Sequence, residues 1–133
     1  MANPNIVNVT SIYGNTAYVI PSGTSATVSW TYNGTTSLTG LTPAAGTVNK
    51  LDSIIASNVT ASAVAVTVSV NSATGGGGTA YRLAYQISVP ANASLIIVDK
   101  TTAQYIGEGQ SVVVTVGTGS AIELVASYEA ITS

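Results

Sequence analysis

The chain has 133 residues, a net charge of −2 at pH 7 and only 6% charged residues, against about 25% in an ordinary soluble domain. Its 46% hydrophobic content is too high for a disordered chain, and polar residues interrupt every apolar stretch before it reaches the roughly 20 residues of a membrane helix. Its three basic residues neutralise too few phosphates for nucleic-acid binding. We expect one domain over residues 1–133, with an extended arm at residues 1–5.

Hydroxyl and amide side chains supply most of the polarity, with 19 Thr, 16 Ser and 9 Asn residues. Thr suits exposed strand positions, whereas Ser and Asn suit turns. Weakly charged surfaces tend to associate. The composition therefore favours a chain that works while packed against other chains.

Turn residues divide the N-terminal part of the chain into short strands. The predicted strands cover residues 5–13, 17–21, 26–32 and 47–57, with a turn at 14–15 and a long loop at 33–45. Trp30 and Tyr32 are two residues apart and share one strand face, as is typical of a core or interface pair. Lys50 and Asp52 also share a face, which allows an ion pair between them.

The C-terminal part shows the clearest strand pattern, because valine occupies every even position from Val64 to Val70. The glycine run at 75–78 predicts a flexible hairpin tip, and Gly117-Thr118-Gly119 predicts a second hairpin. The predicted strands of this part cover residues 64–71, 81–89, 95–100, 104–106, 111–116 and 122–128. The unbroken apolar run at 95–98 predicts a strand buried on both faces, with a subunit contact covering the second face.

Short strands at this spacing predict an all-β fold, an antiparallel β-sandwich or jelly roll of about eight strands. Helix-forming residues are scarce and β-branched residues are common along the whole chain. The order of the strands within the sheets does not follow from the pattern.

Catalytic chemistry has few candidate residues, because the chain lacks both His and Cys. The usual nucleophile–base pairs and zinc ligands are therefore missing. Five carboxylates remain, but their spacing predicts neither a glycosidase pair nor a calcium loop. We predict no enzyme activity, no cofactor and no metal, although the tyrosines leave sugar binding open.

Several short motifs occur in a characteristic order in the C-terminal two-thirds of the chain. They are Lys50-Leu51-Asp52-Ser53-Ile54-Ile55-Ala56-Ser57-Asn58, Tyr81-Arg82-Leu83-Ala84, Ile87-Ser88-Val89-Pro90-Ala91, Asp99-Lys100, Tyr105-Ile106-Gly107-Glu108-Gly109-Gln110-Ser111 and Ser127-Tyr128-Glu129. In their order and spacing, residues 50–131 resemble small virion structural proteins of tailed bacteriophages, notably phages of marine bacteria and cyanobacteria. Members of that family often carry a Glu-Glu-Gly-Asp-like turn where this chain has only Glu108.

The resemblance implies a β-rich protein of the virion exterior, made in the host cytoplasm, with no catalytic residues. The expected function is a capsid decoration (cement) protein, a trimer that bridges major capsid subunits. A neck, tail or fibre protein that binds host glycans through loops 33–45 and 75–78 is the alternative, and a cell-envelope hydrolase is a third hypothesis. The candidate interface residues are Trp30, Tyr32, Arg82, Ile96, Asp99, Lys100, Tyr105 and Glu108.

Overall fold

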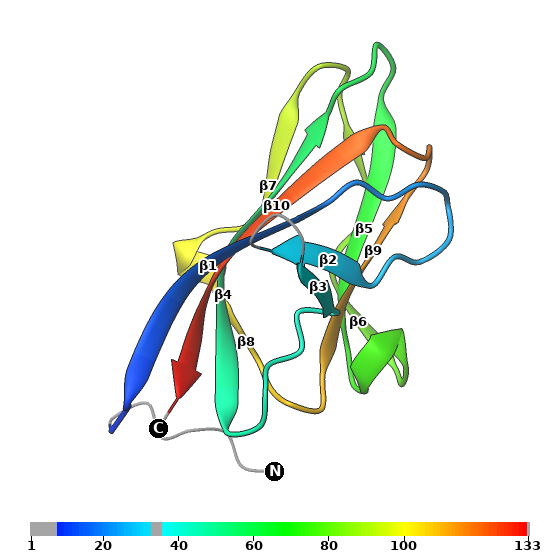
Figure 1. Ribbon diagram of the computed structural model, residues 1–133. Helices are drawn as coiled ribbons and strands as arrows, with labels where there is room; N and C mark the ends of the chain where they lie inside the picture. The colour runs from blue at the N-terminus through cyan, green and yellow to red at the C-terminus, as the bar shows by residue number, and fades with distance from the viewer. Residues whose placement is uncertain (1–7, 33–35, 133) are drawn as a thin grey trace.

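The computed structural model describes residues 8–32 and 36–132, so the predicted arm at 1–5 lies outside the described residues. Within this part the chain is an antiparallel β-sandwich, as predicted (Figure 1). Its larger sheet, sheet A, contains β1 (Ser11–Val19), β2 (Ser29–Tyr32), β3 (Thr36–Thr39), β4 (Thr47–Asn58), β7 (Ser94–Val98), β8 (Gln104–Ile106) and β10 (Ile122–Thr132). Sheet B contains β5 (Val64–Asn71), β6 (Ala80–Val89) and β9 (Ser111–Val116). Two 3₁₀ turns, η1 (Thr74–Gly76) and η2 (Lys100–Thr102), complete the described elements.

The two antiparallel sheets are unequal in size. Sheet A runs β3-β2-β1-β10-β4-β7, with β8 also paired to β4, and sheet B runs β6-β5-β9. The first and last strands are neighbours, from Ser11 opposite Thr132 to Val19 opposite Leu124 (Figure 1). A bridge between Thr27 and Val114 ties the segment before β2 to the outer edge of β9.

The core lies between the two sheets and follows the alternation in the sequence. Val64, Val66 and Val68 on β5 are buried, as their spacing predicts, and they belong to the same apolar cluster as Ile54 of β4 and Leu124 of β10. Burying each such side chain contributes about 1.5–3 kcal/mol. Sheet packing therefore supplies the main stabilisation of the fold.

The predicted turn at 14–15 is wrong, because β1 continues through Gly14 and Asn15. These residues pair with Glu129 and Tyr128 of β10. This long-range pairing overrides the local turn preference of Gly and Asn. The predicted loop 33–45 likewise contains β3, which pairs with β2.

The hairpin predicted at 117–119 is also wrong, because the segment crosses from β9 in sheet B to β10 in sheet A. The Ser120 amide donates a hydrogen bond to the Pro21 carbonyl at 2.7 Å, which draws the link close to the chain after β1. A Cβ atom added at Gly119 would collide with the Ser22 carbonyl. Glycine is required here by close backbone approach.

Gly119→Ala is expected to lower the free energy of unfolding by about 1–3 kcal/mol, the usual cost of forcing extra atoms into packed structure. Gly14→Ala is the matched control, because no atom lies within 4 Å of an added Cβ there. Urea denaturation of both variants measures the difference. Equal unfolding free energies for the two variants would show that the backbone at Ser22 shifts to accommodate the added methyl group without loss of stability.

Within the described chain, the run at 95–98 is buried on one face only, and the predicted subunit contact on its second face stays a prediction. Val98 is 1% exposed, but Ile96 is 62% exposed. Leu95 and Ile97 are partly buried against the core. Sheet B covers only one side of sheet A, so the side of β7 that carries Ile96 faces outward.

Candidate functional site

A line of exposed apolar side chains crosses the outer face of sheet A. Tyr18 of β1 is opposite Val125 of β10, Val125 is opposite Ile55 of β4, and Ile55 is opposite Ile96 of β7. These four side chains, here called the apolar row, are 41%, 42%, 38% and 62% exposed, respectively. With adjacent strands about 4.8 Å apart, the apolar row spans roughly 14 Å.

The strand alternation explains why these side chains face outward. Ala17, Leu124 and Ile54, each adjacent in sequence to a member of the apolar row, are fully buried in the core. Successive strand residues point to opposite faces, so both faces of these strands carry apolar side chains. The inner face is covered by sheet B, and among the described residues nothing buries the outward side chains of the apolar row.

Polar residues, five with hydroxyl groups and one glutamate, border the apolar row on both sides. The cross-strand partners on one side are Thr16, Ser127 and Ser53, and those on the other side are Glu123, Ser57 and Ser94. The Ser57 and Ser94 hydroxyls lie 2.7 Å apart. An apolar centre with a hydroxyl-rich rim is the usual anatomy of a protein interface.

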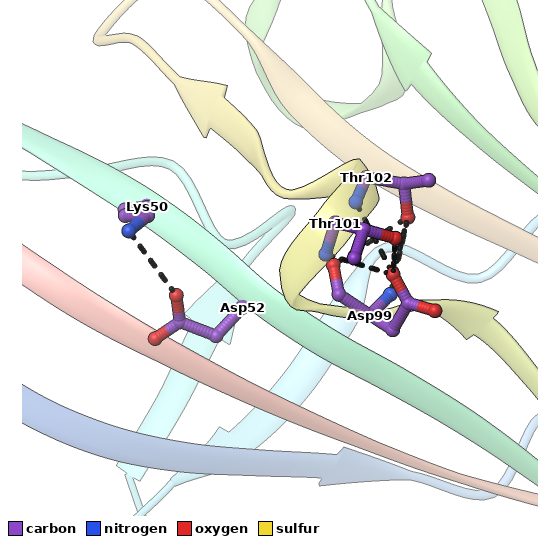
Figure 2. Close-up of polar contacts among 5 residues, drawn as sticks. All are labelled: Lys50, Asp52, Asp99, Thr101 and Thr102. Carbon is purple, nitrogen blue, oxygen red and sulfur yellow. Dashed lines mark hydrogen bonds and ion pairs between the residues drawn. The ribbon is translucent and has the colours of Figure 1, made fainter.

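The charged residues of β4 lie farther along the outer face. Lys50 and Asp52 form the predicted ion pair, with Nζ and Oδ1 3.8 Å apart (Figure 2). Such a solvent-accessible pair contributes about 0–1 kcal/mol. Tyr105 of β8 is opposite Lys50 and is 47% exposed, so it extends the same face.

Asp99 does not continue β7 but caps the η2 turn. Its carboxylate accepts hydrogen bonds from the Thr101 and Thr102 amides at 2.9 and 3.2 Å, and from the Thr101 hydroxyl at 2.6 Å (Figure 2). The Thr102 hydroxyl accepts the Asp99 amide hydrogen in return, which completes a capping box. Asp99 is thus held within its own chain, and Lys100 is an exposed residue of the η2 turn.

The hydrogen bonds from the side chain and backbone of Thr101 are the main cause of a lowered pKa at Asp99. Because the folded-state pKa lies below the ordinary value of 3.8, the cap is fully formed above pH 3.8 and is lost as the pH falls through the lowered pKa. The Thr101 amide, which donates to this carboxylate, is therefore expected to lose its protection from exchange as the pH falls through the lowered pKa. In Asp99→Ala, the Thr101 amide should exchange at the rate of an unprotected amide at every pH, and protection equal to that of the parent chain would contradict the cap.

The other predicted interface residues do not lie on this face. Trp30 is 1% exposed, and its indole N–H is 3.4 Å from the Val112 carbonyl, so it is a core residue and the prediction of an interface role is wrong. Glu108 accepts the Gly46 amide hydrogen and fastens two loops together. The Arg82 guanidinium carbon of β6 lies 5.2 Å from the centre of the Tyr85 ring. Tyr32 lines a hollow on the inner side of sheet A.

Of the predicted residues, the structure therefore brings Ile96 and Tyr105 onto one face. Sequence reasoning missed Tyr18, Ile55 and Val125. A signal was present, because Ile54-Ile55 and Leu124-Val125 place two large apolar residues on opposite faces of one strand. Their alignment with Ile96 depends on the register between distant strands.

Among the described residues, no three carboxylates come together as a metal-binding group. No helix in the described part of the chain has the length and apolar character needed to cross a membrane. No protein-family model, curated protein or solved structure matches the chain.

Proposed function

We propose that the chain is a bacteriophage virion structural protein, a decoration protein that bridges neighbouring major capsid subunits on the particle exterior. The apolar row is the observation that carries this proposal. Exposed apolar patches rimmed by polar residues mark interaction sites. Covering the row in an assembly would remove Tyr18, Val125, Ile55 and Ile96 from water together.

The chemistry of this face favours a protein partner. The centre is apolar and the rim offers hydroxyl groups, so docking would combine hydrophobic burial with short-range hydrogen bonds. A stable interface buries about 800 Å² on each partner, which requires the rim and the neighbouring Tyr105 as well as the row itself. With only eight charged residues in the chain, long-range attraction to nucleic acid contributes little.

Two further points support a place in the virion. The order of motifs in residues 50–131 resembles that of phage virion proteins, and jelly rolls are frequent in viral capsid and lectin domains. The fold by itself assigns no function. In this proposal the chain is made in the host cytoplasm and docks as a trimer at the three-fold positions of the capsid lattice.

The number and location of copies per particle test the proposal. Quantitative mass spectrometry of intact virions is expected to show many copies, in a fixed ratio to the major capsid protein. Antibodies against the chain should label the whole head. A few copies, with label confined to the neck or tail, would contradict decoration and favour the neck, tail or fibre alternative.

A further inference from the structure

A hollow of about 240 Å³ lies on the opposite side of sheet A from the apolar row. Its floor is formed by inward side chains of β1, β10 and β4, and the segment 38–44 forms one wall. Tyrosines from three strands line it, namely Tyr13 of β1, Tyr32 of β2 and Tyr128 of β10. We call it the tyrosine hollow.

The strand register creates this space. Ala130 lies between Tyr13 on β1 and Asn49 on β4, its direct cross-strand partners. A short methyl group therefore occupies the middle of the floor, with larger polar side chains on both sides. The Asn49 amide donates to the Leu41 carbonyl at 2.9 Å, which anchors the wall to the floor.

The lining combines apolar side chains, among them Leu38, Pro43 and Ala44, with uncharged polar groups, and it carries no charged side chain. Hydroxyl groups come from Thr42, Thr47 and Thr132, and amide groups come from Asn15 and Asn49. Burial, assisted by the neighbouring Tyr32, raises the pKa of Tyr128 to about 12. The Tyr128 phenol therefore stays neutral, and able to donate a hydrogen bond, throughout the physiological pH range.

Tyr13 gives the hollow an apolar platform at its mouth. Its side chain is 65% exposed, although it extends from the inner side of β1. A tyrosine ring presents an apolar face and a polar tip, which suits ligands that combine C–H and O–H groups. An exposed ring beside uncharged hydrogen-bonding groups thus defines the chemistry of the ligand.

We propose that the tyrosine hollow binds one ring of a neutral sugar, with the ring stacked on Tyr13 and its hydroxyls bonded to the threonine and asparagine groups. The lining contains neither a cation for an acidic ligand nor a carboxylate for a basic one. Thr42, Asn15 and Asn49 already donate hydrogen bonds within the chain, and the Thr47 and Thr132 hydroxyls bond each other. Their oxygens keep acceptor capacity, which suits the hydroxyl donors of a ligand. The volume is below the roughly 300–1,000 Å³ of pockets for drug-sized ligands, as expected for a single ring.

Saturation-transfer NMR on the full chain tests this site directly. The probes are glucose, galactose, mannose and N-acetylglucosamine, with glucuronic acid as the charged comparison. At least one neutral sugar is expected to receive saturation, and glucuronic acid is expected to receive much less. No transfer to any of the four neutral sugars would overturn the proposal.

Three variants place the binding in the hollow. Tyr13→Ala is expected to abolish transfer, whereas Tyr85→Ala, which removes a ring 58% exposed on β6, should leave transfer unchanged. Tyr128→Phe keeps the ring but removes one hydrogen bond, so affinity should fall about tenfold. Unchanged binding in Tyr13→Ala, or equal loss in Tyr85→Ala, would overturn the assignment. Because the apolar row lies on the opposite face, this result is independent of capsid docking.

Discussion

Ile96→Asp is expected to prevent the chain from docking on virions while leaving its own fold intact. Ile96 is the most exposed member of the apolar row, and a carboxylate there would have to lose its water without gaining a partner. Interface residues of this kind cost about 2 kcal/mol or more when altered, roughly thirtyfold in dissociation constant. Rebinding of purified variants to particles stripped of the protein, followed by sedimentation, measures the effect.

Two further variants separate the contact from general effects of an added charge. Val59→Asp places the same group at a 52% exposed position in the loop after β4, outside the apolar row, and it should rebind normally. Ile96→Thr keeps a β-branched side chain but removes apolar area, so its rebinding should be intermediate. Thermal unfolding followed by circular dichroism should be nearly the same for all three variants. Normal rebinding by a folded Ile96→Asp chain would show that the row is not the docking surface.

Trp30→Ala is expected to lower the free energy of unfolding by about 3–5 kcal/mol, the range for removing a buried large aromatic side chain. Trp30 belongs to the buried cluster between the sheets, and its indole N–H reaches the backbone of β9. Removing the indole would leave a cavity, and the Val112 carbonyl would lose the hydrogen bond that it accepts from Trp30. Urea denaturation monitored by far-UV circular dichroism gives the change without depending on tryptophan fluorescence.

Tyr105→Ala is the contrasting change on the outer face. With Tyr105 47% exposed, the unfolding free energy should change by about 0.5 kcal/mol or less. If Trp30→Ala were equally mild and instead reduced docking, the assignment of Trp30 to the core would be contradicted.

Much of the fold could be predicted because the local alternation of apolar and polar residues indicates which strand residues are buried. The predicted bounds of the strands at 64–71, 104–106 and 111–116 agree with β5, β8 and β9. The predicted antiparallel β-sandwich is confirmed, with ten strands among the described residues. The sequence pattern missed β3 and divided β1 at Gly14, because these pairings depend on strands that are distant in sequence or fall within turn-rich segments.

The surface was harder to predict than the fold. Composition indicated Ile96 as an apolar contact, and the structure leaves it exposed. It could not indicate that Ile55 and Val125 would stand beside it, because a one-residue change of register would turn each of them into the core. For Trp30 and Tyr32, shared strand phase left core and interface equally open, and only sheet packing distinguishes the two.

The pairing of β1 with β10 also determines when β1 can complete its folding during synthesis. Ser11 pairs with Thr132, and at roughly 5–20 residues per second a ribosome takes about 6–24 s to make the intervening chain. The β5–β6 hairpin can form before β10, the main pairing partner of β1, has been synthesised. During this interval β1 presents unpaired backbone and its tyrosines to other nascent chains, so crowded polysomes are the setting in which misassociation of this protein should begin.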